Sequence, residues 1–279
     1  MQKIKSRIRK NMWGLCLFIL VISINTVYGQ QISRDSVNRI LRTTPPFTIY
    51  KDNYIITGST IGEKPTSSNS DVKYQISFKH RLTNASLPLN SYLFLTYTQL
   101  AFWDIYHWSS PFNEINFNPG LGLGKLLFKD GKLIGSLALQ VEHESNGWDS
   151  TMSRSWNYAS FSYTTAISSK SILQLKAWVP FFYKQDNPDI IDYVGYGQAT
   201  YIWEIKKDKL LLDVTGRKGT SGWKGNIQTQ LSFKPFKSGN AFVTLQWYQG
   251  YAESLSQYQQ STSMLRLGIA IKPPTYLFY

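Results

Sequence analysis

Cysteine is almost absent from this chain of 279 residues: Cys16 is the only one, and it lies near the N-terminus. A single cysteine excludes a disulfide within the chain. The stability of a protein of this size must then come from its own architecture instead of from covalent cross-links.

Long hydrophobic runs are also scarce. The apolar run Met12–Ile24 is too short for a typical membrane-spanning helix. It is preceded by the basic residues Lys3, Lys5, Arg7, Arg9 and Lys10 and is followed by Val27-Tyr28-Gly29. This order predicts a signal peptide over residues 1–29, cleaved after Gly29. An uncleaved N-terminal anchor is the alternative.

Acidic residues are few, with 17 Asp and Glu against 30 Lys and Arg, and the formal net charge is +13. The predicted leader carries five positive charges and no negative charge, so its removal lowers +13 to +8. The remaining Lys and Arg are scattered singly or in pairs, without a basic run or a nucleic-acid motif, which argues against nucleic acid as a partner. Attraction to an anionic lipid surface fits an exported protein better.

A sustained helical period is missing after residue 30, and strict alternation takes its place. In 132–145 the apolar positions are Leu133, Leu137, Leu139 and Val141, and polar residues such as Gln140, Glu142 and Glu144 lie between them. Segments 223–234 and 264–272 repeat the pattern. Alternation of this kind predicts strands with one apolar and one polar face.

Twelve segments of this type follow one another, and short polar turns alternate with longer loops. The segments are 46–58, 71–81, 90–105, 113–129, 132–145, 154–168, 171–184, 189–206, 209–217, 222–235, 240–252 and 262–273. The series predicts an all-β fold, a twelve-stranded antiparallel transmembrane β-barrel of the bacterial outer membrane. We assign the barrel to residues 46–279 and a periplasmic N-terminal segment to residues 30–45.

A soluble secreted β-sandwich or a lipocalin-like barrel is the competing architecture, in which the apolar face would point to a core. The number of strands and the aromatic residues near strand ends favour the membrane barrel, because aromatic girdles lie at both membrane interfaces.

Polar residues with catalytic chemistry share the predicted lipid-facing side. His143 and Ser145 have the parity of Leu139 and Val141, and they lie about 6.6 Å apart along the strand. Asn157 and Gln99 have the outward parity of their own segments. A hydroxyl, an imidazole and a group that orients the imidazole are the parts of a nucleophilic acyl-transfer site. On an outward face such residues are costly without a purpose, and they would meet the ester end of a lipid acyl chain.

The motif His143-x-Ser145-Asn-Gly147, followed by Ser153-Arg-Ser-Trp-Asn157, resembles the outer-membrane phospholipase A family. Further similar segments extend the resemblance over about residues 45 to 272: Pro46-Phe-Thr-Ile-Tyr50, Tyr97-Thr-Gln99, Ser109-Ser-Pro-Phe112, Asp186-Asn-Pro-Asp189 and Gly250-Tyr-x-Glu-Ser-Leu255. The resemblance implies a calcium-dependent serine hydrolase of membrane phospholipids that is activated by homodimerisation.

By the same resemblance, each site residue has an implied role. Ser145 is the nucleophile, His143 the general base and Asn157 the residue that orients the imidazole. Gly147 and Gln99 serve as oxyanion and orienting residues. The implied calcium ligands are the carbonyls of Trp148 and Ser153, the Ser109 hydroxyl of a second copy, and Asp186 at a secondary site.

Two positions depart from the family pattern. Trp148 stands where the family has a loop arginine, and Ser150 replaces a nearby acidic residue. Because the implied ligand at Trp148 is a main-chain carbonyl, the first change leaves that ligand in place, whereas the second removes a carboxylate from the secondary site. A non-catalytic outer-membrane barrel, such as a narrow porin or an inactive structural relative, is the alternative function.

Overall fold

The computed structural model describes residues 34–237, 239–273 and 276. The predicted signal peptide and the first residues of the predicted periplasmic segment lie outside the described residues, so both remain predictions. In the described part of the chain, no helix has the length and apolar character needed to span a membrane.

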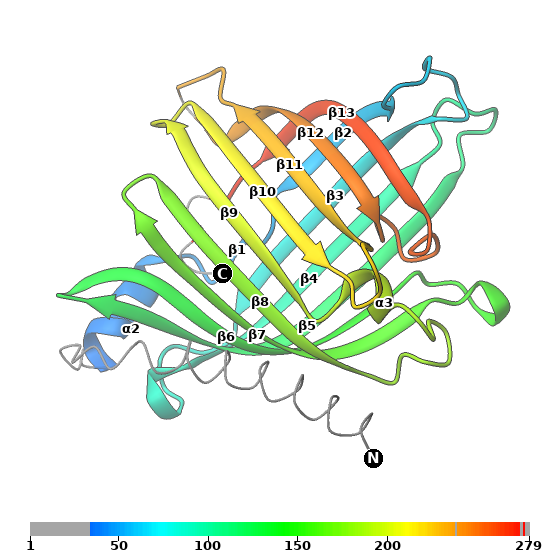
Figure 1. Ribbon diagram of the computed structural model, residues 1–279. Coiled ribbons are helices and arrows are strands. Elements are labelled where there is room, and N and C mark those ends of the chain that lie inside the picture. The colour runs from blue at the N-terminus through cyan, green and yellow to red at the C-terminus, as the bar shows by residue number, and fades with distance from the viewer. Residues whose placement is uncertain (1–33, 238, 274–275, 277–279) are drawn as a thin grey trace, which may run out of the picture.

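Twelve antiparallel strands form a closed barrel (Figure 1), because each strand pairs with its neighbours in the chain and β2 pairs with β13. This confirms the predicted fold class. The barrel strands are β2 (Asn53–Thr60), β3 (Ser70–Arg81), β4 (Tyr92–Trp103), β5 (Phe112–Lys129), β6 (Lys132–Ser145), β7 (Ser155–Ser168), β8 (Ser171–Phe181), β9 (Gly197–Lys206), β10 (Leu210–Lys218), β11 (Gly225–Phe233), β12 (Ala241–Tyr251) and β13 (Ser261–Ile271).

The first predicted strand, 46–58, is interrupted in the structure. A short strand β1 (Phe47–Ile49) pairs with one end of β3, and β2 pairs with the other end. Between them, the backbone N–H of Lys51 donates to Ser77 Oγ at 3.2 Å, and Asn53 Oδ1 accepts from the Ser77 N–H at 2.5 Å. Side chains therefore replace ladder bonds here, and the chain bends so that Lys51 and Asp52 line the barrel interior.

The predicted segment 189–206 was wrong in its first part. Residues before β9 form a turn and the short helix α3 (Ile191–Val194), which lies at the long-loop end of the barrel (Figure 1). Ile190, Ile191 and Val194 are buried there against Trp156, Tyr158 and Trp178. These residues are apolar because they are buried inside the end of the barrel, and not because they belong to a strand.

A helix that the sequence analysis did not predict covers the opposite end of the barrel. In α2 (Arg34–Thr43), Val37 and Leu41 are buried against inward-facing Tyr92, Phe94 and Ala138. Arg81 fastens the helix end, since its guanidinium donates to the Leu41 carbonyl at 2.5 Å. The helix therefore packs as a cap on the short-turn end.

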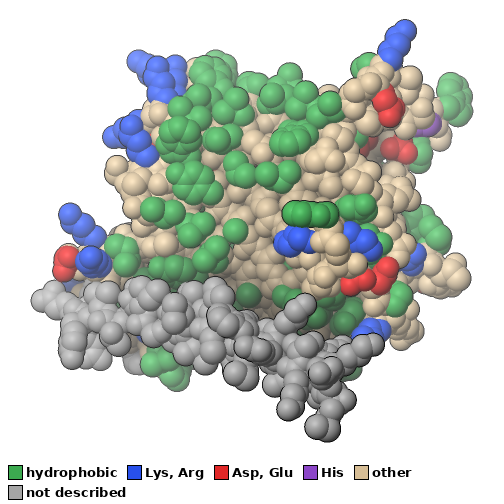
Figure 2. All heavy atoms as spheres, in the orientation of Figure 1, with side chains coloured by type: hydrophobic (Ala, Val, Ile, Leu, Met, Phe, Trp, Pro, Cys, Tyr) green, Lys and Arg blue, Asp and Glu red, His purple; other side chains and the backbone are tan. Residues whose placement is uncertain are grey.

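The outer surface is apolar along the strands, as alternation predicts. Leu139 and Val141 are each 56% exposed, whereas the intervening Gln140 and Glu142 are each 2% exposed. Figure 2 shows hydrophobic side chains spread over one face of the barrel, with most Lys and Arg side chains near its edges and a small group on the right half of the face. The polar residues of the strands therefore face inward, the arrangement of a barrel surrounded by lipid.

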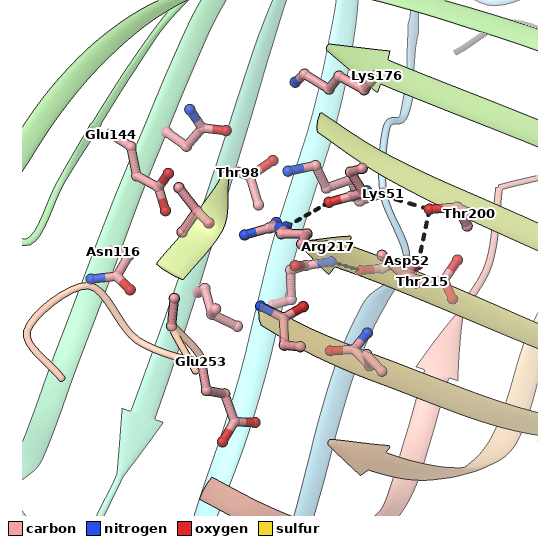
Figure 3. Close-up of a pocket in the computed structure, with 18 of the residues that line it drawn as sticks. Lys51, Asp52, Thr98, Asn116, Glu144, Lys176, Thr200, Thr215, Arg217 and Glu253 are labelled. Carbon is pink, nitrogen blue, oxygen red and sulfur yellow. Dashed lines mark hydrogen bonds between the residues drawn. The ribbon is translucent and has the colours of Figure 1, made fainter. Parts of the chain in front are cut away.

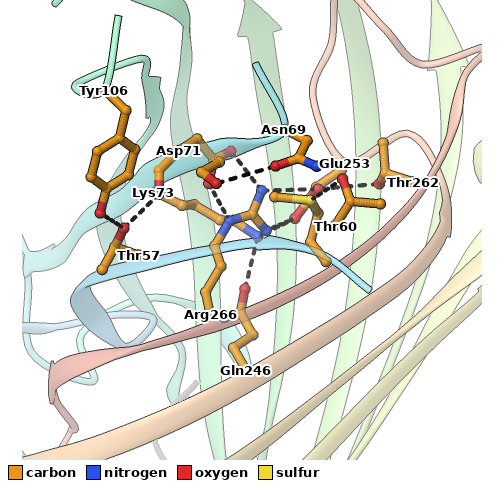
Figure 4. A network of polar contacts seen from close by, with 12 residues as sticks. Thr57, Thr60, Asn69, Asp71, Lys73, Tyr106, Gln246, Glu253, Thr262 and Arg266 are labelled. Atoms are coloured by element: carbon orange, nitrogen blue, oxygen red, sulfur yellow. Dashed lines mark hydrogen bonds and ion pairs between the residues drawn. The ribbon is translucent and has the colours of Figure 1, made fainter. Parts of the chain in front are cut away.

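Ion pairs fill much of the interior. Arg266 contacts Asp71 and Glu253 at 2.6 Å, and Lys73 contacts Glu253 at 3.0 Å (Figure 4). Buried charges persist when they are paired and hydrogen-bonded in this way. Beside this network lies a cavity of about 320 Å³, lined by polar residues that include Lys51, Glu144 and Arg217 (Figure 3).

Candidate active site

His143 and Asn157 lie directly opposite each other on β6 and β7. Their side chains meet on the outer face of the barrel, with His143 Nδ1 3.0 Å from Asn157 Oδ1. Because an amide oxygen only accepts, Nδ1 carries the proton in this contact, and Nε2 of a neutral imidazole is left able to accept one. The pair therefore has the geometry of a base and its orienting group.

Ser145 is the last residue of β6 and shares the face of His143. It is half-buried, and its strand partners are Phe117 on β5 and Ser155 on β7. Within the described residues, the Ser145 hydroxyl makes no hydrogen bond with the imidazole. The structure thus brings the three predicted triad residues to one patch of the outer surface and joins two of them by a hydrogen bond.

The loop after Ser145 is held by Asn146, a residue that the sequence analysis left without a role. Its side-chain amide donates to the Met152 carbonyl at 2.9 Å and to Ser256 Oγ at 3.1 Å. Its oxygen accepts from the backbone N–H groups of Arg154 and Trp148, at 3.0 and 3.3 Å. Asn146 is 3% exposed. The Asn-Gly dipeptide is a turn signal that could have identified it.

Gly147 occupies a backbone conformation that favours glycine, with φ +72°. A Cβ atom at this position would lie 2.9 Å from the Phe117 ring. Both observations require glycine directly after the Ser145-Asn146 step. The predicted oxyanion donor therefore lies in a turn whose shape is set by its neighbours.

Gln99 lies on the outer face of β4, opposite Phe117, which is itself opposite Ser145 on the next strand. Its amide donates to Tyr74 Oη at 3.2 Å and accepts from Tyr97 Oη at 3.0 Å. Gln99 and Ser145 therefore lie at the same level of the barrel, with β5 between their strands. Two tyrosines hold the Gln99 side chain in place.

The predicted metal ligands divide into two groups. Asp186 and Ser153 lie together, since one carboxylate oxygen of Asp186 accepts from Ser153 Oγ at 3.2 Å and from Ser155 Oγ at 2.8 Å. Trp148 is in the same loop as Ser153 and is 54% exposed. Ser109 is in the exposed loop between β4 and β5, with φ +69°.

Arg154 is a further loop residue that sequence reasoning missed. Its guanidinium donates to the carbonyls of Thr151 and Ser153, at 3.0 and 2.7 Å. The Ser153 carbonyl is also the one that the resemblance assigns to calcium. A carbonyl oxygen has two lone pairs, so the second lone pair of Ser153 remains for a cation.

Two other loops support the site from inside the barrel. Asn187 donates to the Ser155 carbonyl at 2.6 Å, and Tyr258 donates to the Asp189 carboxylate. Burial and the neighbouring Asp189 carboxylate raise the pKa of the Tyr258 hydroxyl. The bond between Tyr258 and Asp189 joins the loops 252–260 and 182–196, and Asn187 joins the second loop to the start of β7.

Residues 37–271 match the family model described as phospholipase A1. The phospholipase A1 of Salmonella typhimurium is 29% identical over 272 residues, which cover 89% of this chain and 91% of the relative. That of Escherichia coli K12 is 29% identical over 289 residues, which cover 93% of this chain and 96% of the relative.

Solved structures agree. Outer membrane phospholipase A from Escherichia coli superposes with a TM-score of 0.73 at 27% identity, covering 82% of this chain and 99% of that chain. The Salmonella typhi outer membrane phospholipase, a dimer with bound calcium, gives a TM-score of 0.73 at 27% identity, covering 86% and 99%. The chain therefore belongs to the phospholipase A1 family, and it is an outer-membrane β-barrel with phospholipase activity.

Proposed function

We propose that Ser145, His143 and Asn157 form the catalytic triad of this phospholipase. Its substrates are the acyl esters of phospholipids and lysophospholipids. The enzyme therefore has phospholipase A1, phospholipase A2 and lysophospholipase activity. One observation carries the proposal: the imidazole of His143 is hydrogen-bonded to Asn157 on the lipid-facing side of the barrel, two residues from a serine on the same face.

In the proposed reaction, His143 Nε2 takes the proton of the Ser145 hydroxyl as Oγ attacks the ester carbonyl. The tetrahedral intermediate collapses to an acyl-enzyme, and the leaving alcohol takes the proton from the imidazolium. Water then attacks the acyl-enzyme with His143 again as base, the fatty acid departs, and Ser145 recovers its proton. Asn157 keeps the imidazole in the tautomer that both steps require.

The backbone N–H of Gly147 is the proposed donor to the oxyanion of the intermediate. The position of this N–H depends on the turn after Ser145, which Asn146 stabilises by accepting from the backbone N–H groups of Trp148 and Arg154. Gln99, held by Tyr74 and Tyr97 in the row of Ser145, is proposed as an orienting residue on the same face.

The loop residues fit calcium by the chemistry of their donors, because carbonyl, hydroxyl and carboxylate oxygens are the ligands that calcium prefers. The carbonyls of Trp148 and Ser153 and the Ser109 hydroxyl of a second copy would hold the ion, and Asp186 would contribute to a secondary site. Calcium, when bound, supplies positive charge beside the oxyanion. The related Salmonella typhi enzyme is described as a dimer with bound calcium.

A membrane position for the site is supported by the loops around it. On the long-loop end, five aromatic side chains are at least half exposed: Trp108 98%, Trp148 54%, Phe182 86%, Tyr196 54% and Trp223 98%. Aromatic side chains of this kind lie at membrane interfaces. We therefore place the site at the interface on the outer-leaflet side, where the ester bonds of the lipid lie.

Replacing the nucleophile tests the triad. Purified wild-type protein in mixed phospholipid–detergent micelles with calcium should release fatty acid, and Ser145→Ala should not. The matched control is Ser162→Ala on β7, a serine on the inner face that lines the cavity. Equal release by wild type and Ser145→Ala would overturn the triad, whereas an inactive wild type would return the choice to a non-catalytic barrel.

A chelator tests the metal separately. Excess chelator should abolish fatty-acid release, and added calcium should restore it. Activity that is undiminished by the chelator would remove calcium from the proposed mechanism while leaving the triad intact.

A further inference from the structure

The ladder between β5 and β6 is interrupted behind His143. Pairing runs from Lys129↔Lys132 to Gly120↔Glu142 and resumes at Phe117↔Ser145. In the gap, Pro119 lies opposite His143. Proline has no backbone N–H, so the His143 carbonyl lacks the ladder donor that any other residue at position 119 would supply.

A side chain fills the missing bond. Asn118 Nδ2 donates to the His143 carbonyl oxygen at 2.9 Å. Because this carbonyl points toward β5, the pairing of His143 with Asn157 on β7 is of the non-hydrogen-bonded kind, in which opposing side chains approach most closely. The backbone direction that Asn118 holds is therefore the one that brings the imidazole to Asn157.

A buried network sets the orientation of the Asn118 amide. Its Nδ2 also donates to Tyr158 Oη at 3.1 Å, and Tyr158 Oη donates to Glu142 Oε2 at 3.3 Å. Glu142 in turn accepts from Ser160 Oγ at 2.5 Å and pairs with Lys176 at 2.6 Å. Asn118 is 8% exposed and Glu142 is 2% exposed. An amide fixed between two acceptors has little freedom to turn away from His143.

We propose that Asn118 is a positioning residue for His143, acting from inside the barrel through the backbone of the general base. The inference rests on the proposed function of His143. Asn118 lies on the face opposite to the lipid, so it acts without touching the substrate. Its loss leaves the His143 carbonyl without a donor and removes the side-chain bond that holds the backbone of His143 to β5.

The first test is Asn118→Leu, which keeps the branched shape of the side chain and removes its donor. Active sites are counted with a serine-reactive fluorophosphonate, and kcat is expressed per labelled site. We expect kcat to fall about tenfold or more with KM changed by less than about twofold, because small displacements of a catalytic group have effects of this size. The matched control is Gln140→Met on β6, a buried amide that bonds to the side chains of Tyr50 and Thr96 and not to His143.

The second test restores the missing bond from the backbone. In the double variant Asn118→Leu/Pro119→Ala, residue 119 regains an N–H that faces the His143 carbonyl. Measured against Pro119→Ala alone, the double variant should keep kcat within about threefold. Rescue by a backbone donor is expected only if the bond to His143 is what Asn118 contributes.

Unchanged kcat per labelled site in Asn118→Leu would overturn the proposal, as would a lowered kcat that Pro119→Ala does not rescue. If Asn118→Leu does not fold, Asn118→Ser replaces it, since a serine hydroxyl is too short to reach the carbonyl and should give the same loss. Failure of this inference leaves Ser145→Ala inactive, whereas failure of the triad itself leaves Ser145→Ala active, so the two outcomes are distinguishable.

Discussion

His143 and Asn157 are direct strand partners, and their side chains are joined by a 3.0 Å contact on the outer face of the barrel. The proposed orienting group is a neutral amide. A carboxylate at the same place would face lipid, where an ionised group is strongly disfavoured. The amide oxygen accepts a hydrogen bond from Nδ1–H without adding a charge to the lipid-facing surface.

Asn157→Ala should lower kcat about 100-fold, since the imidazole loses the partner that holds its tautomer and orientation. Asn157→Asp keeps an acceptor at the same distance and should retain at least tenfold more activity than the alanine variant. Fatty-acid release per labelled active site measures both. Similar activity in Asn157→Ala and wild type would exclude the orienting role.

Gly147→Ala should lower kcat roughly tenfold to a hundredfold, because the new methyl group meets the Phe117 ring and shifts the proposed oxyanion donor. Gly131→Ala is the matched control. Gly131 has a similar φ of +75°, but no atom beyond its two chain neighbours lies within 4 Å of the position of its Cβ. It should share the backbone strain of about 1 kcal/mol and keep full kcat. Equal losses in the two variants would point to strain alone.

Asp186→Asn should raise the calcium concentration for half-maximal activity about tenfold, because a carboxylate is a much stronger calcium ligand than an amide. The amide oxygen still accepts from the Ser153 and Ser155 hydroxyls, so the loop keeps its support. Asp208→Asn, in a short turn, removes the same charge outside the loops of the site and should leave the calcium titration unchanged. Coincident calcium titrations for the wild type, Asp186→Asn and Asp208→Asn would exclude Asp186 as a calcium ligand.

Mixing two inactive variants tests the contribution of a second copy. Ser109→Ala and Ser145→Ala should each have low activity alone. If Ser109 completes the site of its partner, a mixed dimer contains one intact site, made of Ser145 from one copy and Ser109 from the other. Co-refolding equal amounts should therefore recover about a quarter of wild-type activity, since half of the dimers are mixed and each has one site. A mixture no more active than its components would place Ser109 outside the partner's site.

Much of the barrel was predictable because alternation is a local property of the chain. Each of the twelve predicted segments overlaps a barrel strand, and β6 begins and ends at the predicted residues. Alternation also placed His143, Ser145 and Asn157 on the outward side. Prediction failed at residues 189–196, where Ile190, Ile191 and Val194 are apolar because they fill the barrel end. An apolar strand and a short apolar segment that fills the barrel end have the same composition, so the sequence does not distinguish them.

The supporting residues were beyond the reach of the sequence. Nothing in the sequence around Asn118 shows that it bonds to a carbonyl on β6. The Asn146-Gly147 dipeptide signals a turn, but it does not show that Asn146 accepts from the backbone of Arg154. Both bonds depend on strand register, which is decided by pairing along the whole barrel and not by any one segment.

The sequence by itself determined the strands, their lipid-facing sides and, through a motif of fifteen residues, the family. It could do so because side-chain direction along a strand repeats every two residues. Only the tertiary structure decided which residues meet: His143 with Asn157, Asp186 with Ser153, and Asn118 with the backbone of His143. These contacts join residues up to 33 positions apart in the chain, and the pairing of adjacent strands sets their distances.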